Sequence, residues 1–151
     1  MTTQADFTPQ EWELVREAPT SAGMIVITAE HGGTFRETYS MAKAYAEARQ
    51  HHGQSELLDE IVASKPKTDH TRYHSPEELK DHALGHIREA VALLESKAQP
   101  QELDEYSGFV VSLAERVAHA HSEHRGEAGS VSEAEQAAID AIKQAVGKET
   151  A

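Results

Sequence analysis

Apolar residues recur every three or four positions along most of this chain, which is the period of an amphipathic α-helix. The two longest such segments are 76–97 and 100–123, and each has one apolar stripe. Because so few residues separate them, we expect the two helices to pack as an antiparallel hairpin. Further helices are predicted over 9–18, 20–30, 35–51, 55–63 and 133–146.

The segment after Pro19 is ambiguous, because Met24-Ile25-Val26-Ile27 is rich in residues that are favoured in strands. No other part of the chain offers a strand to pair with it. We therefore predict a buried helix over 20–30, separated from the helix over 9–18 by the proline.

Helix-start signals support this assignment. A capping box places Ser or Thr three residues before Glu, so that each side chain bonds the other residue's backbone N–H. Four such boxes occur in the chain: Thr8–Glu11, Thr34–Glu37, Ser75–Glu78 and Ser132–Glu135. The predicted fold class is all-α, a single-domain bundle over 1–151 with five to seven helices built on the long hairpin. Residues 1–7 and 147–151 are expected to be disordered tails.

The charge balance restricts the class of partner. Lys and Arg together number 14 against 26 Asp and Glu, which gives a net charge of −12. Such a chain repels nucleic-acid backbones and anionic membranes, so neither is expected as a partner. A basic protein, a second copy of the chain or a metal ion fits better. The longest apolar run, Met24–Ile27, is far too short to cross a bilayer.

The chain has ten histidines and no cysteine. Without cysteine there are no disulfides, thiolate zinc sites or cysteine nucleophiles, and no secretory leader is apparent, so a cytoplasmic location is expected. Histidine titrates near neutral pH and binds transition metals. Protonating all ten would change the net charge from −12 to −2, which permits a pH-responsive role.

Several histidines are predicted to meet at one end of the hairpin. If the chain turns near residue 99, the start of the first long helix lies beside the end of the second. Glu78, His82 and His86 follow one another at four-residue spacing, which places them on one helical face. The candidate ligands for a divalent transition metal are His74, Glu78, His82, His86, His121 and His124. His70, in the preceding loop, is close enough in sequence to join them.

The simpler interpretation of these histidines is structural. His82 and His86 lie on the flank of the apolar stripe, and His119 is on the solvent side, which is typical of solvated helix residues. The chain lacks the Glu-x-x-His pairs of di-iron bundles and the His-Glu-x-x-His motif of zinc proteases. It also lacks a nucleophile elbow, a phosphate-binding P-loop and a dinucleotide fingerprint.

Ala29-Glu30-His31-Gly32-Gly33 is a second candidate, since a glutamate and a histidine before a helix start could bind an anion or act as an acid/base pair. A turn between two helices explains the same residues more simply. The aromatic residues at helical spacing are expected to fill the core: Phe35, Tyr39, Tyr45, Tyr106 and Phe109.

Two segments resemble a loosely defined group of small, uncharacterised, all-helical bacterial proteins. One is Phe7–Trp12 followed by Glu17-Ala18-Pro19, and the other is Ser112–Ala118 followed by Val131–Glu135. The resemblance implies a bacterial helical domain and no particular activity.

Three functions stay open, in order of preference. The first is a non-enzymatic interaction or accessory protein, acting as a homodimer or with a basic partner. The second is a histidine-rich metal-binding bundle for zinc, nickel, copper or iron. The third is a pH-responsive module. No catalytic residue and no cofactor site is assigned, and an enzyme is the less favoured reading.

Overall fold

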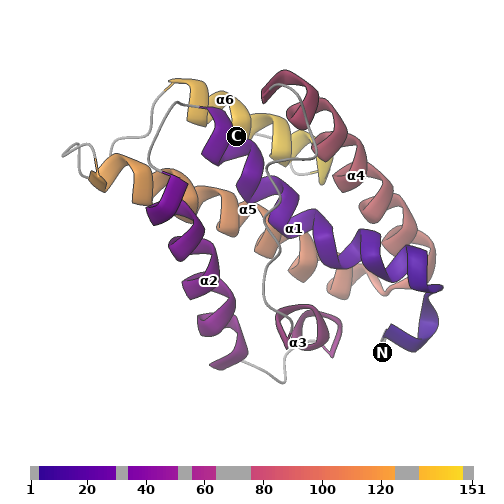
Figure 1. Ribbon diagram of the computed structural model, residues 1–151. Helices are drawn as coiled ribbons and strands as arrows, with labels where there is room; N and C mark the ends of the chain where they lie inside the picture. The colour runs from indigo at the N-terminus through magenta and orange to yellow at the C-terminus, as the bar shows by residue number, and fades with distance from the viewer. Residues whose placement is uncertain (1–3, 30–33, 51–55, 64–75, 125–132, 148–151) are drawn as a thin grey trace.

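The computed structural model of the chain describes residues 4–29, 34–50, 56–63, 76–124 and 133–147, and all of its regular elements are helical (Figure 1). A short 3-10 helix, Gln4–Asp6, precedes six α-helices. These are α1 (Pro9–Ala29), α2 (Thr34–Gln50), α3 (Glu56–Ala63), α4 (Pro76–Lys97), α5 (Pro100–His124) and α6 (Glu133–Ala145). The all-α bundle predicted from the sequence is therefore confirmed, and Met24–Thr28 lie in a helix.

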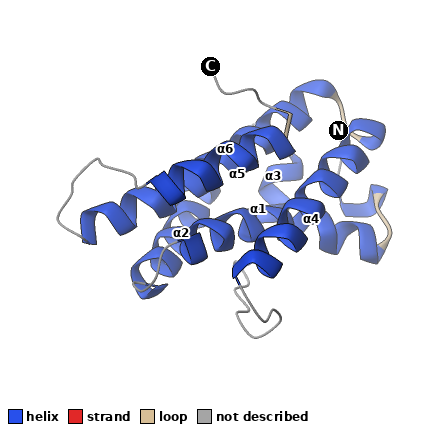
Figure 2. Ribbon diagram, turned by 90° about the horizontal axis from the view of Figure 1, so that it is seen from above, coloured by secondary structure: helices blue, strands red, loops and turns tan. Residues whose placement is uncertain are grey.

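Helix α1 is the centre of the bundle. It packs against α4, α5 and α6, and more lightly against α2, while α2 and α3 complete the assembly on the side of α5 (Figures 1 and 2). Its buried residues Val15, Ala18, Ala22 and Val26 recur at the spacing of one helical face. Buried side chains from all six α-helices join them in one hydrophobic cluster. Burial of this apolar surface is what holds the helices together.

The predicted break at Pro19 is wrong, because α1 continues through the proline from Pro9 to Ala29. A proline inside a helix has no N–H to give to the carbonyl four residues earlier, here that of Val15. The structure supplies a substitute donor, since the hydroxyl of Tyr106 on α5 bonds the Val15 carbonyl oxygen at 2.7 Å. Tertiary packing thus overcomes a local signal that favours two helices.

The two long helices α4 and α5 form where the apolar period predicts them. Pro100 begins α5, and the Gln99 N–H at the turn donates to Glu102 Oε1 at 3.1 Å. Yet α1, rather than α5, is the principal neighbour of α4. Figure 1 shows α4 and α5 meeting at their turn and then running to different sides of the molecule.

Of the predicted N-terminal tail 1–7, the structure describes residues 4–7, and these pack against the bundle. Gln4–Asp6 form the 3-10 helix, and Phe7 is buried with its ring centroid 5.8 Å from that of Trp12. The capping box beside them is confirmed, because the Thr8 N–H donates to Glu11 Oε1 at 2.9 Å and the Glu11 N–H donates to Thr8 Oγ1 at 3.2 Å. The start of α1 is therefore held by its own side chains.

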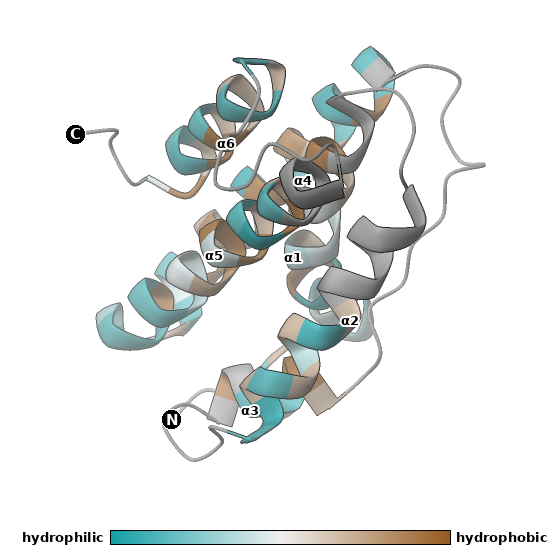
Figure 3. Ribbon diagram, turned by 90° about the vertical axis from the view of Figure 1, so that its left-hand side faces the viewer, coloured by the Kyte–Doolittle hydropathy of each residue, from teal (hydrophilic) through white to brown (hydrophobic). Residues whose placement is uncertain are grey.

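Hydrophilic and hydrophobic residues lie side by side along the helices (Figure 3). This is expected for helices that have one solvent-facing side and one buried side. Within the described part of the chain, no helix combines the length and the apolar character needed to cross a lipid bilayer.

Candidate functional site

The predicted metal ligands divide between α4 and the end of α5. Glu78, His82 and His86 are on α4, where His82 is exposed and the other two side chains are half-buried. His121 and His124 occupy the last turn of α5, but the positions of their side chains lie outside the described structure, as does all of His74. The expected meeting of these residues depended on α4 and α5 lying side by side to their far ends, and in Figure 1 those ends lie apart.

Among the side chains that the structure describes, no group of three or more histidine and carboxylate residues is close enough to hold a metal ion. The six-residue site stays a prediction, since half of its ligands lie outside that set. His119 is exposed on α5, as the helical period predicts. The second candidate, Glu30-His31-Gly32-Gly33, also lies outside the described residues.

Buried hydroxyl groups form hydrogen bonds to α1 near its proline. Next to Pro19, the Thr20 Oγ1 lies 3.1 Å from the Tyr45 hydroxyl of α2, and one of the two donates to the other. Tyr45 in turn packs edge-on against Phe109 of α5, with ring centroids 5.5 Å apart. These contacts and the Tyr106–Val15 bond join α1, α2 and α5 through polar groups that water does not reach.

Burial changes the acidity of both tyrosines. Desolvation raises the pKa of Tyr106 well above its ordinary value of 10.0, and the nearby Tyr45 raises it further. The pKa of Tyr45 is also raised by burial, against the opposing effects of Thr20, Arg16 and Arg49. Both hydroxyls are therefore neutral at physiological pH and act as hydrogen-bonding groups between the helices.

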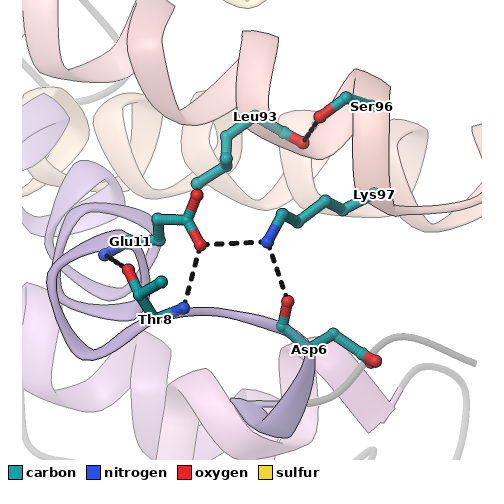
Figure 4. A network of polar contacts seen from close by, with 6 residues as sticks. All are labelled: Asp6, Thr8, Glu11, Leu93, Ser96 and Lys97. Atoms are coloured by element: carbon teal, nitrogen blue, oxygen red, sulfur yellow. Dashed lines mark hydrogen bonds and ion pairs between the residues drawn. The ribbon is translucent and has the colours of Figure 1, made fainter.

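A second polar network lies at the surface, where the end of α4 meets the start of α1 (Figure 4). Lys97 Nζ donates to Glu11 Oε1 and to the main-chain oxygen of Asp6, both at 2.9 Å, and lies 5.4 Å from the centre of the Phe7 ring. The pKa of Glu11 is lowered, first by the hydrogen bond from the Thr8 backbone and then by Lys97. Lys97 therefore fastens the N-terminal segment to α4.

The sequence analysis missed both tyrosine hydroxyls as structural groups and treated them as apolar filler. The available signal was Pro19, because a proline inside an apolar helical period leaves a carbonyl that needs a donor from elsewhere. The Lys97 contact had no signal, since its partners are far from it in the sequence.

Comparison with known proteins gives no relative from which a role could be transferred. No family model, no curated protein and no solved structure matches the chain.

Proposed function

We propose that the protein is an acidic interaction or accessory protein that binds a basic protein partner through the outer face of α4. The observation that supports this is the distribution of charge on that helix. Its exposed acidic residues extend over its whole length and are Glu77, Asp81, Glu89 and Glu95. The opposite face is occupied by packing against α1 and α6, so the acidic face is the one a partner can reach.

Exposed Arg88 lies on the same helix and offsets one of these four charges. Arg16, Lys97 and Arg116 are each paired with a carboxylate of the protein itself, Glu13, Glu11 and Glu47 respectively. With a net charge of −12, the surface favours a partner that carries clustered lysine or arginine.

The test is a capture experiment with the full chain and a variant that carries Asp81→Asn, Glu89→Gln and Glu95→Gln. The expected result is a partner that the wild type retains at low salt, that high salt releases, and that the variant fails to retain. A matched variant on α5, Asp104→Asn with Glu115→Gln, should keep the partner. If the partner is retained independently of salt and of the α4 carboxylates, the proposal is contradicted. It is also contradicted if size-exclusion chromatography at low salt shows no complex between the protein and the partner.

A further inference from the structure

Helix α4 places two histidines one turn apart on its accessible side. His82 is exposed and His86 half-buried, and each directly precedes a buried residue, Ala83 and Ile87 respectively. The two buried residues hold this part of α4 against the core, and the four-residue spacing aligns the histidines along the helix axis. Side chains at this spacing have Cβ atoms about 5–6 Å apart, which lets both imidazoles reach one ion. We call His82 and His86 the α4 histidine pair.

The helix surface between the two histidines is uncrowded at Gly85. This residue lies between them in the sequence, and a Cβ atom added to it would meet no other atom within 4 Å. The other described helices therefore do not cover α4 at this position.

The charge near the pair favours a cation. The carboxylates of Glu78, Asp81 and Glu89 lie within about one helical turn of the pair, and they outnumber the cations of Lys80 and Arg88 in the same stretch. Acidic surroundings raise the local concentration of divalent ions. Since no third side chain among the described residues completes a cluster, the pair would supply two ligands and water the remaining ones.

We propose that the α4 histidine pair chelates one late transition-metal ion, Ni²⁺, Cu²⁺ or Zn²⁺, at the surface of the bundle. Neutral imidazole nitrogen suits these metals, with metal–nitrogen distances of about 2.0–2.1 Å for zinc. The site needs only α4 and is independent of the proposed interaction role, because metal binding is measured on the purified chain without a partner.

The test is calorimetric titration of the full chain with Ni²⁺ and Zn²⁺, together with native mass spectrometry. We expect His82→Gln and His86→Gln each to weaken the tightest binding event by about tenfold or more, and the double variant to do no more than either single one. This non-additive pattern is specific to chelation, because one remaining histidine cannot form the ring of bonds. The matched control, His119→Gln on α5, should bind as the wild type does.

A second variant tests the spacing while it keeps the number of histidines constant. In His86→Gln with Glu89→His, the two histidines of α4 are seven residues apart, about two turns and too far for one ion. This variant should not recover the wild-type affinity. Full recovery would overturn the proposal, as would wild-type binding by either single variant. Circular dichroism of each variant confirms that the surface changes leave the helices intact, and metal should raise the melting temperature only where the pair is present.

Discussion

The hydroxyl of Tyr106 on α5 donates a hydrogen bond of 2.7 Å to the main-chain carbonyl of Val15 on α1. This is the carbonyl that Pro19 leaves without its helical N–H, four residues further along the same helix. Val15 and Tyr106 are both fully buried, so water cannot supply the missing donor. One tyrosine therefore satisfies the polar group that the proline leaves unpaired and joins two helices of the bundle.

Replacing Tyr106 with phenylalanine should destabilise the protein by about 1–3 kcal/mol, because the buried Val15 carbonyl loses its tertiary partner while the shape of the ring is kept. Chemical denaturation of the wild type and the variant gives this difference in the free energy of unfolding. The cause can be isolated in a double-mutant cycle with Pro19→Ala. An alanine at position 19 brings back the N–H, so Tyr106→Phe should cost less in that background. Equal costs in the two backgrounds would show that the tyrosine stabilises the fold for another reason.

The same relationship explains where the sequence was informative and where it was not. The apolar period and the caps identify every described α-helix from α2 to α6 to within a residue or two, because these signals are local. Pro19 led to the wrong prediction of a helix break. The carbonyl that it leaves without a helical N–H receives a hydrogen bond from Tyr106 on α5, which is 91 positions away from Val15 in the sequence. Local rules cannot anticipate such a distant partner.

A buried pair of hydroxyls gives a second prediction. Thr20 and Tyr45 form one hydrogen bond between α1 and α2 and lie within the core. Thr20→Val and Tyr45→Phe should each destabilise the protein by about 1 kcal/mol or more, since each leaves one buried hydroxyl unsatisfied. The double variant should be more stable than the sum of the single costs implies, because both polar groups are then gone. Strict additivity in the free energies of unfolding would contradict the pairing.

The arrangement of the helices, in contrast to their positions in the sequence, could not be predicted. An apolar stripe tells which face of a helix is buried but not which helix covers it. The stripes of α4 and α5 are consistent with a hairpin packed along its length, yet α1 is the principal neighbour of α4. The predicted six-residue metal site depended on that hairpin. The α4 histidine pair depends only on the spacing within one helix, which the sequence does determine.

Gly85 and Gly147 offer a matched pair of substitutions. Gly85 is in the middle of α4 with open space around it, so Gly85→Ala should stabilise the protein by about 0.5–1 kcal/mol. Gly147 follows α6 with a φ of 82°, and its N–H donates to the Gln144 carbonyl at 3.1 Å. Gly147→Ala should destabilise by about 1–2 kcal/mol, because a side chain disfavours that left-handed conformation although it meets no neighbour. Thermal melts of both variants check this, because the melting temperature should rise for Gly85→Ala and fall for Gly147→Ala. A change in the same direction for both variants would contradict these roles of the two glycines.

Acid should weaken the junction between α1 and α4. The pKa of Glu11 lies below its ordinary value of 4.5, mainly because the Thr8 N–H donates to the carboxylate and also because Lys97 bonds it. A carboxyl with a lowered folded pKa stabilises the protein above its unfolded pKa. That contribution is lost as the pH falls through the folded value. Above pH 4.5 the wild type should therefore have a higher melting temperature than Glu11→Gln. Below pH 4.5 this difference in melting temperature should disappear.

Glutamine at position 11 can still accept the cap hydrogen bond, so this comparison isolates the negative charge. Glu95→Gln, a change at an exposed residue of α4, is the matched control and should show no comparable convergence with the wild type on acidification. Adding salt at neutral pH should reduce the difference in melting temperature between the wild type and Glu11→Gln. The reason is that the Lys97–Glu11 ion pair is partly exposed, so salt screens it. If the difference in melting temperature between the wild type and Glu11→Gln stayed constant from pH 7 to pH 3, the Glu11 charge would not contribute to holding the N-terminal segment on α4.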